Sequence, residues 1–307
     1  MTSYFPEGRL IDMPFNIAAV KNAASLSEAA AKGQILEARV SLCDTAHNLI
    51  VDLGAIKGII PREEGAIGIA EGIVRDIALI SRVNKPVCFT VTELRTDESG
   101  NAEALLSRRA AQERCVSEYV SALRPGDIID ARVTHLESFG AFCDIGCGIV
   151  SLIPIDAISV SRISHPRDRF RPGSDIRTIV RAIEPDGKIS LTHKELLGTW
   201  EENASQFQQG ETVSGIVRSV EEYGIFVELT PNLAGLAEPK EGVAVGQRAS
   251  VFIKSILPNK MKLKLIIIDA FDAEATPIPP KYYFDGSHME RFVYSPEESF
   301  RVVETVF

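Results

Sequence analysis

Alternating hydrophobic and polar positions predict short β-strands along most of the chain. Ile129, Ala131 and Val133 are separated by polar residues, so one face of this run packs and the other meets water. Three segments repeat the same order of such runs, with opening runs at Gly33 to Val40, Gly126 to Val133 and Gly210 to Val217. Five short strands rejoined by glycine turns are typical of an OB-fold barrel. The fold class we predict is mainly β: three tandem five-stranded OB-fold barrels with helical connectors and an irregular C-terminal tail.

The runs also predict where one segment ends and the next begins. Ser25 and Glu28 resemble a capping box at the start of a helix ahead of the first barrel. Good helix formers follow the first barrel and end before Pro125, and prolines break the pattern after about Asp269. Aromatic residues in the tail favour docking on the rest of the protein. The predicted segments are an N-terminal helical segment (1–32), a first repeat (33–109), a helical linker (110–124), a second repeat (125–195), a helical linker (196–208), a third repeat (209–268) and a tail (269–307).

Composition narrows the class of protein. A chain of 307 residues with 45% hydrophobic content suits two to four folded modules. No apolar run reaches membrane-span length, and the N-terminus up to Arg9 has no signal architecture, so we expect a cytoplasmic protein without a membrane partner. The 5 cysteines are odd in number and irregularly spaced, which indicates reduced, packed thiols. We expect no metal ion and no cofactor.

Two repeats place one aromatic ring on the polar phase of their second strand and a second ring three residues before it. The positions are Phe139 and Phe142 in the second repeat and Tyr223 and Phe226 in the third. By alternation, Phe142 shares a face with Asp144, and Phe226 shares one with Glu228, which we interpret as the wet faces. A glycine between the two rings of each pair can supply a bend that brings both to one side. The pattern predicts two-ring platforms on which bases stack, while the alternative is that one ring of each pair caps the core.

A formal net charge of −9 argues against sequence-blind binding of polyanions, so phosphate binding needs a local cluster of cations. The third repeat also carries Lys264 among few acids. The cations that we predict to bind RNA are Arg132, Arg181 and Lys188 in the second repeat and Arg218, Lys254 and Lys262 in the third.

The first repeat lacks the ring pair. His47 and Ile50 stand at the two ring positions, and Asn48 replaces the glycine. We therefore expect little or no RNA binding by this repeat and a docking role instead.

The ring motifs, each following a strand that opens with glycine, resemble the RNA-binding repeat of the bacterial small-subunit ribosomal protein S1 over about residues 33–268. The resemblance implies single-stranded RNA binding on strands two and three, by the ring pairs and by Lys188 and Lys262. It also implies a docking role for early repeats. The histidine that the family has after its third strand is replaced by Pro61, Pro154 and Glu238 in the three repeats.

These observations predict a non-catalytic protein that binds single-stranded RNA or mRNA in translation, with the small ribosomal subunit as a partner. A protein-interaction scaffold and a ribosome-independent RNA regulator are the alternatives. An enzyme such as a nuclease is disfavoured, because the sequence has no phosphate-binding glycine loop, metal-ligand cluster or triad spacing.

Overall fold

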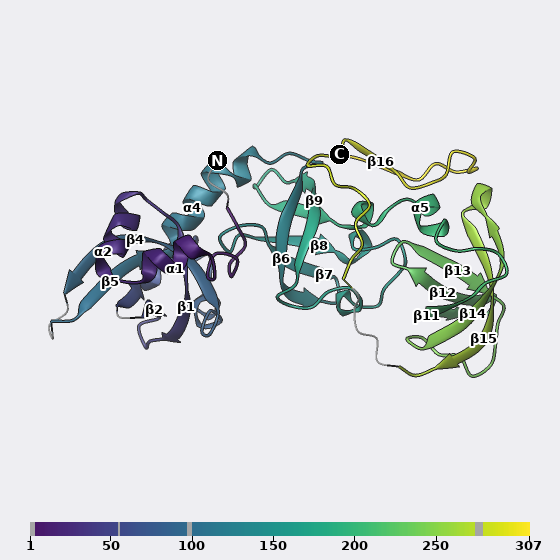
Figure 1. Cartoon of the computed structure of the whole chain (residues 1–307), viewed down its shortest axis with the longest axis horizontal. Coiled ribbons are helices and arrows are strands. Elements are labelled where there is room, and N and C mark those ends of the chain that lie inside the picture. Colours follow the sequence, from purple (N-terminus) through teal and green to yellow (C-terminus); the bar gives the residue numbers. More distant parts are fainter. Residues whose placement is uncertain (1–3, 55, 97–99, 274–278) are drawn as a thin grey trace. The chain divides into compact units, whose positions relative to one another are not determined.

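The computed structural model of the chain describes residues 4–54, 56–96, 100–273 and 279–307 (Figure 1). The first residues of the predicted N-terminal segment and part of the predicted tail, 274–278, lie outside these ranges. Contacts between residues divide the chain into two units. The first comprises Met1–Leu123 and Asp144–Val150, and the second comprises Arg124–Cys143 and Ser151–Phe307.

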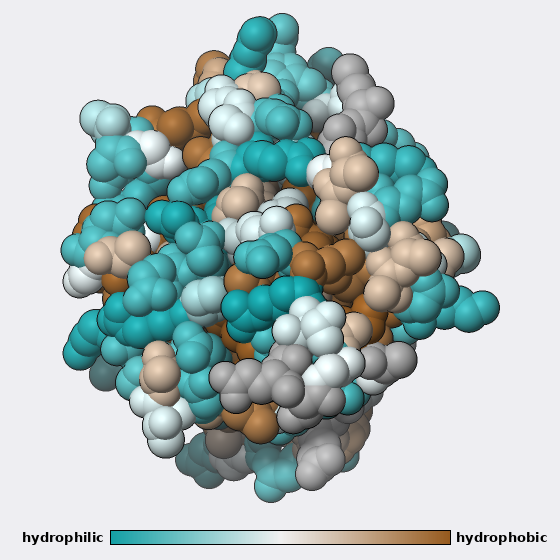
Figure 2. Space-filling model, turned by 90° about the vertical axis from the view of Figure 1, so that its left-hand side faces the viewer, coloured by the Kyte–Doolittle hydropathy of each residue, from teal (hydrophilic) through white to brown (hydrophobic). Residues whose placement is uncertain are grey.

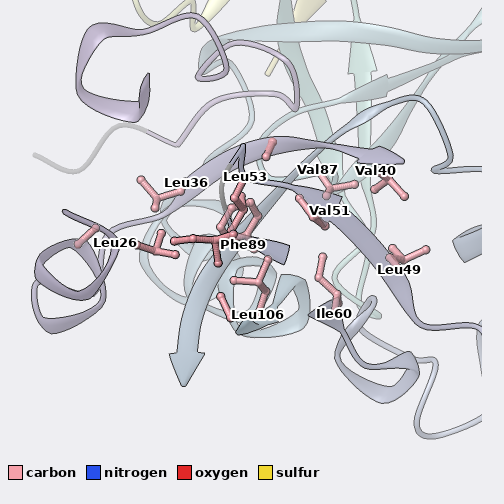
Figure 3. Packing of buried hydrophobic residues seen from close by; sticks show 14 of the residues in the cluster. Leu26, Leu36, Val40, Leu49, Val51, Leu53, Ile60, Val87, Phe89 and Leu106 are labelled. Carbon is pink, nitrogen blue, oxygen red and sulfur yellow. The ribbon is translucent and has the colours of Figure 1, made fainter. Parts of the chain in front are cut away.

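The first unit contains a closed barrel with the strand order β1-β2-β3-β5-β4. Its β3 and β5 pair in parallel, and the other neighbouring strands pair antiparallel. Phe89, Leu106 and Leu26 point into one apolar core (Figure 3). The strands are β1 (Leu36–Cys43), β2 (Leu49–Asp52), β3 (Lys57–Ile60), β4 (Pro86–Thr96) and β5 (Ala102–Ser107).

Helices accompany this barrel on both sides in the sequence. The predicted capping box at Ser25 and Glu28 is wrong, because the helix begins earlier: Asn22 is the N-cap, and its side-chain oxygen accepts a hydrogen bond from Ser25 N at 2.9 Å. The predicted linker helix begins directly after β5, where the Ser107 hydroxyl accepts from Ala110 N. The elements are α1 (Pro14–Val20), α2 (Ala23–Ala31), η1 (Arg62–Glu64), α3 (Ile77–Ile80), α4 (Arg108–Glu118) and η2 (Val120–Ala122).

The second unit contains two closed five-stranded barrels, which confirms the predicted fold class together with the barrel of the first unit. The second barrel has the order β10-β8-β7-β6-β9, and the third has β11-β12-β13-β15-β14. Strands of the second barrel are β6 (Ile128–Glu137), β7 (Gly140–Asp144), β8 (Val150–Pro154), β9 (Asp175–Ile183) and β10 (Ile189–Thr192). Strands of the third are β11 (Thr212–Glu221), β12 (Gly224–Thr230), β13 (Leu233–Ala237), β14 (Arg248–Leu257) and β15 (Lys262–Phe271).

Short helical elements replace the long connector predicted between these two barrels. Helix α5 (Trp200–Ala204) has a complete capping box formed by Thr199 and Glu202. The remaining elements of the unit are η3 (Ile155–Ala157), η4 (Pro166–Asp168), η5 (Lys194–Leu197) and η6 (Pro258–Lys260).

The tail packs on the second unit, as its aromatic content predicted, but it is not wholly irregular. Strands β16 (Arg291–Val293) and β17 (Glu304–Val306) pair antiparallel. The Tyr282 hydroxyl accepts a hydrogen bond from Arg177 N at 2.9 Å, and the Tyr294 hydroxyl donates one to Asn232 O at 2.6 Å. The tail therefore contacts both the second and the third barrel.

The surface mixes polar and apolar residues, and the face in Figure 2 is mostly hydrophilic with apolar residues between. Within the described ranges, no helix is both long and apolar enough to cross a membrane.

Candidate nucleic-acid interface

The two predicted ring pairs meet at the surfaces of the second and third barrels. The rings of Phe139 and Phe142 lie 5.9 Å apart, edge to face, and those of Tyr223 and Phe226 lie 6.2 Å apart in the same way. Phe139 is 55% exposed and Tyr223 is 68% exposed, while the other ring of each pair is half-buried. Neither pair is sealed in a core. Each of the two barrels therefore exposes a pair of adjacent aromatic rings to solvent.

The glycine between the rings is required by a close approach of the neighbouring strand. A Cβ on Gly140 would lie 2.5 Å from Ile153 O, and one on Gly224 would lie 2.6 Å from Ala237 O. No side chain fits there without moving the strand that carries the contacted carbonyl. The absence of a side chain on this glycine therefore lets the next strand of the barrel approach the ring-bearing strand closely.

The acids that follow the half-buried rings were predicted to face water, but both are buried. Asp144 and Glu228 are 1% and 5% exposed. Asp144 accepts hydrogen bonds from the backbone nitrogens of Glu7, Gly146 and Gly148 at 2.7 to 3.0 Å. Burial, with the charge of Glu7 adding to it, raises the pKa of Asp144 to about 7.

Glu228 has a different reason for its burial. Its carboxylate binds Arg169 at 2.5 Å and Arg218 at 2.8 Å, and Arg218 also reaches Asp168 at 3.1 Å. Asp168 and Arg169 belong to the second repeat. Arg218 and Glu228 belong to the third barrel. Arg218, which the sequence predicts to bind RNA, is therefore a weak candidate: its side chain is 11% exposed and forms ion pairs with Glu228 and Asp168.

Two predicted cations occupy the same structural position in their barrels. The register of β9 with β10 shifts around Arg181, and that of β14 with β15 shifts around Lys254. Each cation is the extra residue of a β-bulge, and each is exposed. Lys254 lies 3.5 Å from the exposed carboxylate of Glu238. Among the described residues, no carboxylate forms an ion pair with Arg181.

The other predicted cations differ in availability. Lys262 is exposed, and Lys188 is exposed but lies 2.5 Å from Asp186. The guanidinium of Arg132 binds both carboxylate oxygens of Asp175, at 2.8 and 2.9 Å. An exposed ion pair contributes little stability and can exchange for a phosphate, whereas the bidentate pair of Arg132 makes it a weaker candidate.

Two further side chains belong with these surfaces. The His135 ring lies 6.3 Å from that of Phe142 with 25° between the planes. Alternation places His135 on the inward phase after Val133, so the sequence pattern did not reveal it. Lys264 is exposed on the row that runs from Phe226 through Leu236 in the β-pairing. Because Lys264 alternates with Leu263 and Leu265, the sequence pattern alone places Lys264 on the outward face of its strand.

The first barrel has none of this arrangement. Its half-buried His47 and Ile50 stand at the ring positions, and Asn48 binds Asp44 and the Arg62 nitrogen. At the bulge of β4 the extra residue is Thr92, which has no charge. The first barrel therefore lacks both the rings and the bulge cation.

Comparison with known proteins agrees with these repeats. The S1 RNA binding domain model matches residues 122–194. The small ribosomal subunit protein bS1 of Leuconostoc lactis is 31% identical over 252 residues, which span 76% of this chain and 56% of that protein. The bS1 homolog of Bacillus subtilis is 29% identical over 234 residues, 71% of this chain and 58% of that protein.

The chain is thus shorter than the curated relatives that it matches. Among solved structures, a multidomain protein with nucleic acid binding domains from Streptococcus pneumoniae is 14% identical, with a TM-score of 0.25 over 77% of this chain and 74% of that one. The repeat match, the extended similarity to bS1 and the three barrels together show that the chain belongs to the bacterial S1 family.

Proposed function

We propose that this protein binds single-stranded RNA on its second and third barrels, without catalysis. The observation that carries the proposal is the pair of rings that meets edge to face at the surface of each barrel. Base–aromatic stacking contributes about 1–3 kcal/mol per base and tolerates any base, because every base has a flat face. Sequence-tolerant capture of unpaired RNA is the activity that such a surface supports best.

Exposed cations on the same two barrels complete the surface. Arg181 and Lys254 stand at equivalent bulges, and Lys264 lies on the row of Phe226. These groups can bind the phosphates that connect stacked bases, because single-stranded RNA binding combines a cationic track with stacking rings. Although the formal net charge of the chain is −9, these cations provide local positive charge where phosphates can bind.

We expect Arg181→Ala and Lys254→Ala each to weaken RNA binding and to make it less dependent on salt. Each lost phosphate contact should reduce the slope of log affinity against log salt by about 0.7 for a single strand. Fluorescence anisotropy with a short labelled single-stranded RNA at several salt concentrations measures the slope. Arg291→Ala removes an exposed arginine of the tail and should leave the slope unchanged. An equal fall for Arg291→Ala would contradict a local phosphate site.

The relatives are named as small-subunit ribosomal proteins, and we infer a role beside the small ribosomal subunit in the cytoplasm. The first barrel, which lacks the rings and the bulge cation, is the part of the chain that suits protein docking. Sedimentation of a cell lysate through a sucrose gradient should place the protein with small subunits. If it stays at the top of the gradient while the purified chain binds RNA, a ribosome-independent regulator is the better description.

A further inference from the structure

The second barrel carries a ring that the third barrel lacks. His135 is near the end of β6, and its imidazole stacks nearly parallel to Phe142, 6.3 Å away, while Phe139 meets Phe142 edge-on from the turn between β6 and β7. The His135 side chain is 63% exposed, and one of its ring nitrogens lies 2.6 Å from Glu137 Oε1. A hydrogen bond to Glu137 restricts the rotation of the imidazole and keeps its face turned toward Phe142.

The third barrel offers an internal comparison at this position. Its residue corresponding to His135 is Ser219, since the same spacing in sequence relates the ring pairs and the opening glycines of the two repeats. Ser219 is the cross-strand neighbour of Phe226, which confirms that this position lies beside the half-buried ring. The two barrels therefore share the ring pair but differ in the side chain next to it.

We propose that His135 is a third stacking surface, which makes the second barrel the stronger RNA site and gives it a longer footprint than the third. The inference rests on the proposed function. A near-parallel ring extends the platform by a second flat face, and imidazole rings are among those on which unpaired RNA bases stack. Ser219 has no ring and offers only a hydroxyl, so the third barrel holds fewer bases.

The test isolates each barrel in the full chain. In a Phe226→Ala background, binding of a short labelled oligoadenylate reports on the second barrel, and His135→Ser should weaken it about tenfold, as expected for one stacked base. His135→Phe keeps a flat ring and should retain the affinity. In a Phe142→Ala background, which reports on the third barrel, Ser219→His should strengthen binding.

Each result decides between stacking and other roles. Retained affinity in His135→Phe with loss in His135→Ser supports stacking, whereas equal loss in both, or no loss in His135→Ser, overturns the inference. No gain in Ser219→His also overturns it. Because the His135 side chain is exposed, the His135 variants should unfold at the same temperature as their Phe226→Ala background. Failure of the proposed function can be distinguished from failure of the His135 inference, because in the first case the wild-type chain itself would not bind the RNA.

Discussion

Replacing Glu7 by glutamine should destabilise the first unit by about 3–5 kcal/mol, because the change leaves a buried arginine without its counter-charge. The Glu7 carboxylate contacts Arg108 Nε at 2.6 Å and Nη2 at 3.0 Å, and it accepts from Cys88 N at 3.1 Å. The two charged side chains are 5% and 4% exposed. Burial opposes the charge of Glu7, but the charge and hydrogen bonds of Arg108 outweigh it and hold the Glu7 pKa below its usual value.

Hydrogen exchange of the amides of β4 measures this loss within the first unit. The single tryptophan, Trp200, is buried in the second unit, so its fluorescence during urea unfolding serves as an internal reference that should not change. The matched control is Glu28→Gln, which removes an exposed carboxylate paired with Lys32 and should leave β4 exchange unchanged. Equal protection of β4 in Glu7→Gln and wild type would contradict a stabilising role for the buried pair.

Local patterns were sufficient to predict the barrels and the ring pairs. Ala131, Val133, Ala141 and Cys143 are all buried, as period-2 alternation requires. Phe142 stands on the opposite phase of β7, and Phe226 on that of β12, so their surface position follows from the same rule, whereas Phe139 and Tyr223 lie in the turns just before these strands. The tertiary structure adds the reason for the glycine between them, because the carbonyl that excludes a Cβ belongs to another strand.

Contacts between distant segments account for what the sequence did not reveal. Alternation correctly places Asp144 opposite the core, but it does not say what covers that face. The Glu7 nitrogen that binds Asp144 is 137 residues away in the chain. The sequence did not reveal the ion pairs of Arg218 for the same reason, since Asp168 and Arg169 join them from the preceding repeat. A cation on the polar phase of a strand is available to a ligand only if no other segment neutralises it.

Replacing both Phe142 and Phe226 by alanine should cost about 2–6 kcal/mol of RNA-binding free energy, at about 1–3 kcal/mol for each lost stacking face. The effects should add when one RNA occupies both barrels, because the two rings lie on separate barrels and do not touch each other. Fluorescence anisotropy with a single-stranded RNA long enough to reach both barrels measures the loss. Each single variant should retain the site of the other barrel and bind more tightly than the double variant.

Loss of folding is the competing explanation for weak binding, because Phe142 and Phe226 are half-buried. Phe139→Ala with Tyr223→Ala removes the two more exposed rings and should weaken binding while leaving Trp200 fluorescence and the unfolding midpoint close to wild type. Phe15→Ala removes an exposed ring of the first unit and should leave the affinity unchanged. Undiminished RNA affinity in both double variants would mean that these barrels do not bind RNA by stacking, and the surface would then better suit a protein partner.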